Sequence, residues 1–563
     1  MMPVLTGVDI LGIQRYVFGS NRLRDVLAAS WMVEHVTHTK QLKQWSSPRP
    51  SSVLLAAGGN AILEFVSMDA ARCWAALYTR WLYETAPGLE AAIVHRPFEE
   101  RLLAWALSVL QVDLARTKLE RLPSAPQLGL SVTASCTTTG LPATDEDQGA
   151  LISPRVKRLR DRVQEARNRW SEFLPVRGLS ATCESEFPDE IDRMGRTHGE
   201  TSLVGVVHVD GNDVGEQIKR WLSRVGEDVD HATVRKQYQE WSSAIIELGR
   251  AVTKVVAERT AASIQPEENH HVLRGSPFDL GFRLHEWRDG KSRNTTKDKV
   301  FLPLRPVLLG GDDLTFLCDG RIALDLAAVS LKEFARHPIP HLGPGGEETF
   351  LTACAGVALV KTHAPFHRSY ELAEDLCRSA KRARRTANAE LDNETGGWLD
   401  WHIGPTRPGA LVEDIRRRGY RRGEADLTMR PYPLAKLTTR NHSWEWLDRD
   451  LLGPGVAPDP VKQGLRGANC WSGSRSRVKR LGALVSDGAA TIKRQIEAWK
   501  ATDDDLRLPG GLEDGGGYVG ATTPLLDAIE LLDLHMRLKP DPRASVRAEN
   551  ESCADDAGEE GGA

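Results

Sequence analysis

Two short acidic segments of the chain have the residue types and the spacing of a metal-dependent catalytic site. Residues 310–313 read Gly-Gly-Asp-Asp and lie between the apolar runs 307–309 and 314–318, which predicts a β-hairpin with the glycines in its turn. Asp312 and Asp313 are then adjacent carboxylates at the hairpin tip. Because two such charges repel each other, a divalent cation is their natural partner.

The second acidic segment lies upstream. Residues 203–209 are almost entirely apolar, as is typical of a central strand buried on both faces, and residues 210–215 follow as Asp-Gly-Asn-Asp-Val-Gly. If the hairpin lies beside this strand, Asp210 and Asp312 can hold two Mg²⁺ or Mn²⁺ ions, with water and substrate phosphates as the other ligands. The sequence therefore predicts a palm-type nucleotidyl transfer site in which Asp210, Asp312 and Asp313 are the catalytic residues and metal ligands.

Neighbouring residues are predicted to assist this site. The backbone carbonyl of Gly211 is a further candidate metal ligand, and Gly310 and Gly311 let the backbone approach a nucleotide without a Cβ in the way. Asn212 and Asp213 are further candidate nucleotide contacts. In the alternative interpretation both acidic segments are solvated turns with local side-chain hydrogen bonds. Their shared position at the ends of two apolar strands favours the catalytic interpretation.

A basic helix is predicted after the two acidic segments. Residues 369–385 place Leu372, Leu376, Ala380 and Ala383 on one face and several basic residues elsewhere. Lys381 is the candidate triphosphate contact, because an ammonium on a flexible stem suits a polyphosphate charge. A solvated face remains an equal alternative for Lys381 and is the favoured interpretation for the arginines.

The order of these segments resembles a known family. It runs through residues 203–215, 310–318, 352–358 and 373–381, and it is similar to the palm domain of the large subunit of type III CRISPR effector complexes. Diguanylate cyclases and class III nucleotide cyclases are more distant relatives of the same pattern. The beginning of the chain extends the resemblance, because residues 9–18 (Asp-Ile-Leu-Gly-Ile-Gln-Arg-Tyr-Val-Phe) resemble the start of that subunit's first palm domain.

A second hairpin near the beginning of the chain repeats the first in degenerate form. Residues 54–63 contain Gly58 and Gly59 at the predicted turn, whereas Asn60 and Ala61 stand where the catalytic hairpin has carboxylates. We therefore expect a first palm without metal ligands. Gly58, Gly59 and Asn60 are its candidate nucleotide-binding residues.

The resemblance implies a fold and a reaction. The implied fold is α+β, with two ferredoxin-like palm domains, a helical connector and a C-terminal helical domain. The first palm would hold one ATP while the second supplies the metal ions, so that a ribose 3′-hydroxyl attacks an α-phosphate and repeated transfer makes a cyclic oligoadenylate. The implied partners are the other subunits of the ribonucleoprotein and its guide RNA, with target RNA contacted indirectly.

Boundaries follow from these motifs and from changes in composition. A polar stretch over residues 266–299 without clear periodicity is expected to be an irregular insertion, either a lid or a partner contact. The acidic, glycine-rich end of the chain is expected to be disordered. The predicted domains are the first palm (1–125), the connector (126–200), the second palm (201–405), the C-terminal helical domain (406–544) and the acidic tail (545–563).

Composition sets the remaining limits. The 563 residues are 41% apolar, which is enough to bury several cores, and the net charge of −4 means that contacts with RNA must be local or made by partners. The eight cysteines form no C-x-x-C pair, which together with the absence of a signal peptide predicts a cytoplasmic protein without a disulfide framework. No apolar run approaches the roughly 20 residues of a membrane span, so no membrane contact is expected.

The chain also departs from the family pattern. The family often has a zinc module between its palms, but Cys136 and Cys183 lack the paired spacing of zinc ligands, so no metal is expected there. None of the 16 histidines is followed by aspartate, so the HD nuclease activity of the family is not expected. His208 faces the same side of its strand as Asp210 and is interpreted as a hydrogen-bonded core group.

Two alternative functions remain open beside cyclic oligoadenylate synthesis. One is a stand-alone nucleotide cyclase or dinucleotide synthase, which the two-palm layout disfavours. The other is a catalytically silent scaffold subunit of the CRISPR complex, which the intact carboxylates disfavour.

Overall fold

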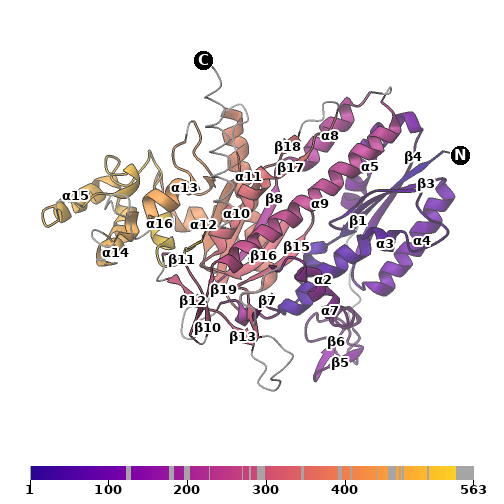
Figure 1. Ribbon diagram of the computed structural model, residues 1–563, viewed down its shortest axis with the longest axis horizontal. Helices are drawn as coiled ribbons and strands as arrows, with labels where there is room; N and C mark the ends of the chain where they lie inside the picture. The colour runs from indigo at the N-terminus through magenta and orange to yellow at the C-terminus, as the bar shows by residue number, and fades with distance from the viewer. Residues whose placement is uncertain are drawn as a thin grey trace, which may run out of the picture.

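The computed structural model places two β-sheets and a group of C-terminal helices along the longest axis of the molecule (Figure 1). The indigo N-terminal sheet lies at one end and the yellow C-terminal helices lie at the other. The acidic tail predicted over 545–563 lies outside the described residues. The structure describes residues 2–121, 129–175, 183–195, 203–226, 229–268, 270–277, 280–287, 298–343, 348–390, 396–405, 409–438, 440–453, 464–467, 471, 475–503 and 506–539.

The first palm is an antiparallel sheet with the strand order β2-β3-β1-β4. Three helices lie between β1 and β2 and one lies between β3 and β4, which gives the βαββαβ order of a ferredoxin-like fold, as the resemblance implied. The strands are β1 (Val4–Leu11), β2 (Ser52–Ala57), β3 (Asn60–Phe65) and β4 (Glu90–Pro97). The helices are α1 (Ile13–Val17), α2 (Leu23–Thr37), α3 (Thr39–Leu42), α4 (Met68–Thr85), η1 (Glu100–Leu102) and α5 (Leu103–Glu120).

Helix α4 illustrates how local sequence builds this layer. The Ser67 hydroxyl accepts a hydrogen bond from the Ala70 amide at 3.2 Å and so caps the first turn. Apolar residues then recur every three or four positions and are buried against the sheet. The buried indole of Trp74 also donates to the Leu42 carbonyl at 3.1 Å, so its polar group is satisfied. The buried residues of the helix are Ala71, Trp74, Tyr78 and Leu82.

The second palm has a larger sheet with the order β15-β16-β8-β19-β20-β23. Its first four strands repeat the order and the antiparallel pairing of the first palm, and β20 is added parallel to β19. The strands are β8 (Leu203–Gly211), β15 (Leu304–Leu309), β16 (Asp313–Asp319), β19 (Ala353–Lys361), β20 (Trp398–Ile403) and β23 (Tyr432–Pro433). The helices are α8 (Val214–Arg224), α9 (His231–Ala262), α10 (Ala323–Arg336) and α11 (Phe366–Glu390).

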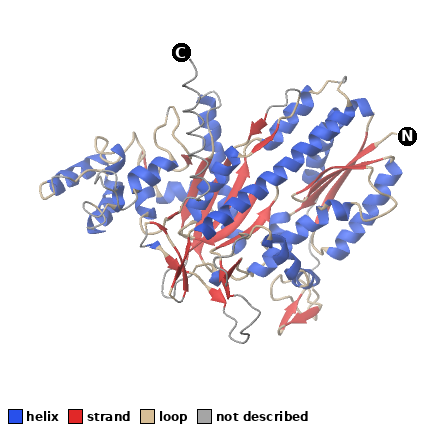
Figure 2. Ribbon diagram, viewed as in Figure 1, coloured by secondary structure: helices blue, strands red, loops and turns tan. Residues whose placement is uncertain are grey.

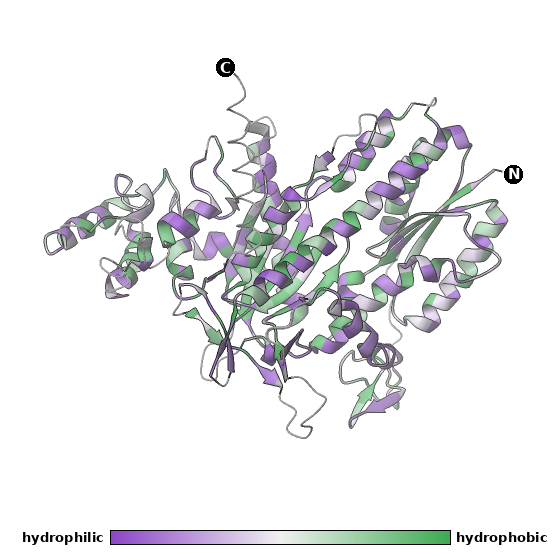
Figure 3. Ribbon diagram, in the orientation of Figure 1, coloured by the Kyte–Doolittle hydropathy of each residue, from purple (hydrophilic) through white to green (hydrophobic). Residues whose placement is uncertain are grey.

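Strand β8 is central because its sequence is apolar on both faces, and Val206, Val207 and Val209 are all buried. Figure 3 shows the hydrophobic residues concentrated in the strands and on the helix faces that cover them. Helix α11 packs closely on the neighbouring strand β19 at Gly356, where an added Cβ would lie 2.0 Å from the Ala373 carbonyl oxygen. This close packing fixes the height of α11 above the sheet.

The stretch 266–299, expected to be irregular, contains short strands among its described residues. Two of them have partners that are distant in the chain, because β14 pairs with β7 of the connector and β11 pairs with β24 near residue 538. The other strands of this stretch pair with near neighbours. Strands of two to four residues are too short to show a periodicity in the sequence. The strands of this region are β7 (Cys183–Glu186), β9 (Ile264–Glu267), β10 (His270–Leu273), β11 (Gly275–Ser276), β12 (Phe282–Arg283), β13 (Glu286–Trp287), β14 (Asp298–Phe301) and β24 (Arg537–Leu538).

The connector packs beside the first palm, with its helices against α2. Its two α-helices lie within residues 154–171, as expected for the helical connector that the resemblance implied. Cys136 is buried and free, whereas the side chain of Cys183 lies outside what the structure describes. The elements are β5 (Asp145–Asp147), β6 (Ala150–Ile152), α6 (Pro154–Arg160), α7 (Val163–Ser171) and η2 (Ile191–Arg193).

The C-terminal helices share a hydrophobic core with the second palm. Trp444 and Leu525 belong to the same buried cluster as Val207 and Trp401 of the sheet, and β23 pairs with β20. No described helix has both the length and the apolar composition needed to cross a membrane. The main elements are α12 (Val412–Gly419), α13 (Trp444–Trp446), η4 (Leu447–Leu452), α14 (Arg475–Leu484), α15 (Ala489–Lys500) and α16 (Leu525–Leu531).

Helices pack against both sheets (Figure 2). The two palms meet through their hairpins. The Ser30 hydroxyl of α2 donates to the Val307 carbonyl of β15, and Gln239 of α9 donates to the Val53 carbonyl of β2 at 2.8 Å. Each hairpin therefore bonds to a helix that lies between the first and second strands of the other palm. This reciprocal contact is the pattern of a two-fold repeat within one chain.

Candidate active site

The exit of strand β8 and the hairpin tip meet as the sequence predicted. Asp210 lies directly opposite Asp313 across the β8–β16 ladder, and the Gly211 amide donates to the Asp312 carbonyl at 3.1 Å. The turn is closed by the Gly310 amide, which donates to the Asp313 carbonyl at 2.8 Å, and Gly311 adopts a φ of +99° that favours glycine. The structure thus brings three carboxylates to one end of two neighbouring strands.

The approach of Asp312 to the strand requires a glycine at position 211. A Cβ added there would lie 2.9 Å from the Asp312 Cβ and 3.3 Å from its Oδ2. The Asp312 side chain therefore rests against the backbone that follows Asp210. Any side chain larger than hydrogen at position 211 would push the hairpin away from the strand.

The proximity of the carboxylates is expressed in their pKa values. Burial, followed by the charges of Asp210 and Asp313, raises the pKa of Asp312 to about 7. Burial is also the main cause that raises the pKa of Asp313, and the neighbouring His208 opposes this shift. Such a cluster is an unfavourable arrangement for the protein alone, and perturbed carboxylates of this kind are typical of functional sites.

His208 is a buried, hydrogen-bonded group, as the sequence interpretation held. Its Nδ1 lies 3.0 Å from the Thr315 hydroxyl and 3.3 Å from Oδ1 of Asp313. That Oδ1 is buried, whereas 43% of the Asp313 side chain is accessible, so the accessible part of the carboxylate is on its other side. His208 therefore orients Asp313 from within the core.

Lys381 reaches the site from α11. Its Nζ lies 2.7 Å from Oδ2 of Asp210 and donates to the Gly211 carbonyl oxygen, also at 2.7 Å. The apolar face predicted for this helix is the one that packs, since Leu372, Leu376 and Ala380 are buried. Lys381, the predicted phosphate contact, is thus bound to Asp210 and Gly211, which are two of the predicted metal ligands.

Asn212 and Asp213 are placed differently from the carboxylates. The Asn212 side chain is buried and donates to the Thr352 hydroxyl at 2.9 Å. Asp213 has a φ of +57° and accepts from Arg384 of α11 at 2.8 Å. These contacts fix the loop between β8 and α8. The role of Arg384 was missed in the sequence, because its partner Asp213 lies 171 residues away in the chain and leaves no local signal.

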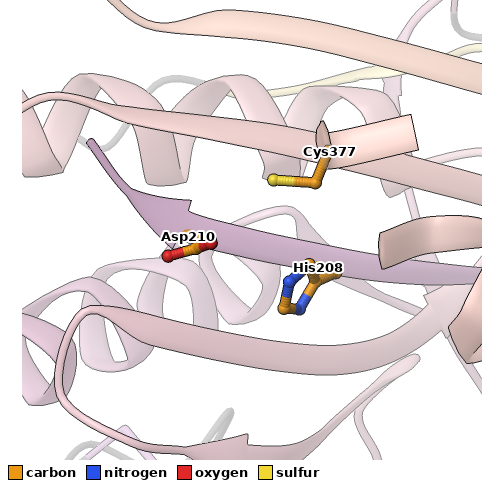
Figure 4. Close-up of side chains that lie close together, drawn as sticks. All are labelled: His208, Asp210 and Cys377. Atoms are coloured by element: carbon orange, nitrogen blue, oxygen red, sulfur yellow. The ribbon is translucent and has the colours of Figure 1, made fainter. Parts of the chain in front are cut away.

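A group of three metal-binding residue types lies on the inner side of Asp210. Ligand atoms of His208, Asp210 and Cys377 lie within 4.8 Å of one another (Figure 4). The Cys377 thiol, however, contacts the Cys354 carbonyl at 3.3 Å, and burial raises its pKa well above the usual value, so the sulfur keeps its proton. This set does not suit a soft metal.

The oxygen donors of the site do suit a hard divalent cation. Asp210, Asp312 and the outer side of Asp313 offer carboxylate oxygens, and Gly211 offers a carbonyl oxygen, which are the ligand types that Mg²⁺ and Mn²⁺ prefer. Burial, followed by the charges of Asp210 and Asp313, raises the pKa of Asp312, so a cation bound here would stabilise its ionised form. These residues therefore fit the predicted metal.

The first palm keeps half of this site. Asp9 lies opposite Asn60 across the β1–β3 ladder, and the Ile10 amide donates to the Gly59 carbonyl at 2.8 Å. Position by position, Asp9 corresponds to Asp210, Gly59 to Asp312 and Asn60 to Asp313. The sequence comparison had placed Asn60 and Ala61 at the two carboxylates, which is one residue too far. The strand pairing decides this register, because both hairpins have a bulge at the same place, between residues 53 and 55 and between residues 306 and 308.

The tips of the two hairpins touch. A Cβ added to Gly58 would lie 3.0 Å from the Gly310 carbonyl oxygen, so the backbones approach closely at this point. The predicted nucleotide-binding glycines of both palms thus lie against each other.

The N-terminal segment also reaches the second palm. Phe18 stacks on Tyr370 of α11 at 4.3 Å between ring centroids, and Gln14 donates to Glu374 of the same helix at 3.2 Å. The Tyr370 ring packs edge-on against His208 at 5.5 Å. The residues that resemble the family's N-terminal motif therefore support the helix and the histidine of the candidate site.

Comparison with known proteins finds similar structures. No family model and no curated protein sequence matches the chain. Crystal structures of a Csm1-Csm4 cassette in complex with cA3 and with cA4 are 14% and 13% identical, have TM-scores of 0.47 and 0.45, and cover 95% and 94% of this chain and 70% of those chains. Csm1 of T. onnurineus is 16% identical with a TM-score of 0.42, over 97% of this chain and 67% of that one. These neighbours are Csm1 chains of type III CRISPR complexes, the class that the sequence motifs resemble.

Proposed function

We propose that the second palm is a metal-dependent nucleotidyltransferase site. The observation that carries this proposal is the convergence of Asp210, at the exit of the central strand, with Asp312 and Asp313 at the hairpin tip. Three carboxylates held this close together repel one another, and a bound cation would offset that repulsion. The first palm lacks carboxylates at the two corresponding hairpin positions, which supports a division of labour between the palms.

The residues of the chain position the reactants. Asp210, Asp312 and the Gly211 carbonyl would hold Mg²⁺, which lowers the pKa of an attacking ribose hydroxyl and stabilises the leaving pyrophosphate. His208 orients Asp313 through its Nδ1. Lys381, on a flexible stem, is within reach of the same oxygens and can follow the charge of a triphosphate. Catalysis would come mainly from position and electrostatic field.

The contact between hairpin tips supports two facing substrates. Because Gly58 lies against Gly310, nucleotides bound beside the two hairpins would be neighbours. We infer that the first palm holds the acceptor nucleotide while the second activates the donor. A single chain would then perform the reaction that two identical subunits perform in a symmetric cyclase.

The substrate, the product and the assembly are proposed from the family resemblance of the sequence motifs. The substrate would be ATP, the product a cyclic oligoadenylate, and the working form an RNA-guided type III CRISPR complex with other subunits, a guide RNA and, indirectly, target RNA. The intact carboxylates of the second palm disfavour a silent scaffold. The second palm in the same chain disfavours a stand-alone cyclase.

The test is product analysis with each of the four nucleoside triphosphates. The purified full chain, alone and with co-purifying partners, is incubated with Mg²⁺ and one nucleotide, and products are identified by mass spectrometry. We expect pyrophosphate and ring-closed oligoadenylates from ATP. The variants Asp210→Asn and Asp312→Asn should lose this turnover by at least about 100-fold.

Asp69→Asn is the matched control for these variants. Asp69 is an exposed carboxylate on α4 of the first palm, so the substitution makes the same chemical change away from the site. It should leave turnover unchanged. Full product formation by Asp312→Asn, or linear products from every nucleotide alike, would contradict the assignment.

A further inference from the structure

Each palm places one lysine on the aspartate of its first strand. In the second palm, Lys381 of α11 contacts Asp210 at 2.7 Å. In the first palm, Lys118 of α5 contacts Asp9 at 2.5 Å. Each lysine lies fifteen residues after the first residue of its helix, from 103 to 118 and from 366 to 381. Since Asp9 and Asp210 occupy the same register position, the two pairs are repeats of one arrangement.

The surroundings of the two pairs differ in charge. Around Asp210 the hairpin adds Asp312 and Asp313, so one ammonium faces three carboxyl groups. Around Asp9 the hairpin offers Gly59 and Asn60, so the ammonium of Lys118 faces a single carboxylate among the corresponding positions. The first pair is therefore balanced, whereas the second site keeps an excess of negative charge that attracts a further cation.

The ammonium of Lys381 also occupies the oxygens that a metal needs. It contacts both a carboxylate oxygen of Asp210 and the carbonyl oxygen of Gly211. A divalent cation bound to these oxygens would repel the ammonium at contact distance. The lysine stem is long and flexible, so the ammonium can leave without moving α11, which Gly356 holds close to the sheet.

We propose, on the basis of the function proposed above, that Lys381 is a resident cation that divalent metal displaces from Asp210 and Gly211. The displaced ammonium is then available to the triphosphate of the incoming nucleotide. Lys118 stays on Asp9, because the first palm lacks the second carboxylate that would recruit a dication. Metal binding and phosphate binding are thus coupled through one side chain in the second palm and uncoupled in the first.

Lysine labelling tests the displacement directly. The full-length protein is treated with an amine-reactive reagent without nucleotide, at zero and at saturating Mg²⁺, and the labelling rates of Lys381 and Lys118 are read by peptide mass spectrometry. Saturation is set by competition with Mn²⁺ in electron paramagnetic resonance titrations. We expect Lys381 labelling to rise about threefold or more with Mg²⁺ while Lys118 labelling stays constant. In Asp312→Asn the rise should disappear.

Metal affinity provides the second measurement. Lys381→Met should bind Mn²⁺ about fivefold or more tightly than the wild type, because the metal no longer competes with an ammonium. Arg384→Met is the matched control, since it also removes a cation and frees one carboxylate, that of Asp213. Its Mn²⁺ affinity should change less than about twofold. Lys118→Met should leave the affinity unchanged.

The outcomes separate this inference from the proposed function. Mn²⁺ binding with unchanged Lys381 labelling, or an equal gain of affinity in Lys381→Met and Arg384→Met, overturns the displacement and leaves nucleotidyl transfer standing. Displacement without turnover of any nucleotide overturns the proposed function and leaves the displacement standing. A chain that binds no Mn²⁺ at all overturns both.

Discussion

Individual carboxylates carry the negative charge of the site, and the loss of folding stability that each one causes can be measured. Asp312 is half-buried beside Asp210 and Asp313, and its raised pKa means that its ionised form is unfavourable in the native state. A cluster of carboxylates of this kind is electrostatically unfavourable, and binding of a cation relieves that cost.

Asp312→Asn is expected to stabilise the metal-free protein more at pH 8 than at pH 5. The native pKa of Asp312 is about 7, above the value near 4 of an unfolded aspartate, so the native state holds more protons in this window and stability falls as the pH rises through it. After solvent screening the gain at pH 8 should be on the order of 1–2 kcal/mol. The measurement is the apparent melting temperature with chelator at both pH values. A gain that is equal at both pH values would contradict the raised pKa.

Gly211→Ala is expected to weaken Mn²⁺ binding by about tenfold, since its Cβ would lie 2.9 Å from both the Asp312 Cβ and the Val214 Cγ2 and push the hairpin away. Gly215→Ala is the control, because the space around a Cβ at that position is open. This second variant should keep its metal affinity and gain some helix stability. The test fails if the two variants bind Mn²⁺ equally well.

The two hairpins are the elements that join the palms. Each makes hydrogen bonds to a helix of the other palm, and their tips meet at Gly58 and Gly310. In the proposed function, the distance between the tips decides whether two bound nucleotides can react. The proposal therefore requires a defined turn conformation at this point.

Gly58→Ala is expected to reduce turnover by about tenfold or more, because the added methyl would press on the Gly310 carbonyl and part the hairpins. Gly12→Ala is matched to it, since the two glycines have φ values of +59° and +63° and Gly12 has open space around it. Both variants should lose about 1–2 kcal/mol from left-handed strain. Equal turnover in the two variants, measured by pyrophosphate release, would exclude a role for the tip contact.

At the scale of the whole molecule, the C-terminal segment completes the core of the second palm. Arg430 is buried, and its Nε and Nη2 lie 2.8 Å from carboxylate oxygens of Asp527 and Glu530 respectively. Its guanidinium also stacks over Trp401 of β20 at 4.9 Å. The segment that bears α16 is thus tied to the sheet by a buried ionic network as well as by apolar packing.

Arg430→Met is expected to destabilise the protein by about 3–5 kcal/mol, because Asp527 would remain buried without its charged partner. The double variant Arg430→Met with Asp527→Asn should recover part of this loss, since the unpaired charge is removed. The apparent melting temperature and the recovery of soluble protein are the readouts. If the double variant is no more stable than the single one, the loss comes from packing and not from the unpaired carboxylate.

The sequence by itself determined the central strand of the second palm, the two hairpins and the identity of the carboxylates. The apolar run before Asp210 and the glycine turn before Asp312 are local signals, and periodicity placed His208 on the face of Asp210. The expected helix over residues 369–385 is observed as α11, somewhat longer at both ends. Local patterns of this kind persist in any fold because they depend on neighbouring residues alone.

The tertiary structure alone decided which residues of the two palms correspond and which residues are in contact. Strand pairing placed Gly59, and not Asn60, at the position of Asp312, and revealed Asp9 with Lys118 as the counterpart of Asp210 with Lys381. Register, bulges and the packing height of a helix are set by contacts between segments far apart in the chain. Those contacts leave no trace in a single local pattern, which is why the half site of the first palm and the meeting of the hairpin tips emerged from the fold.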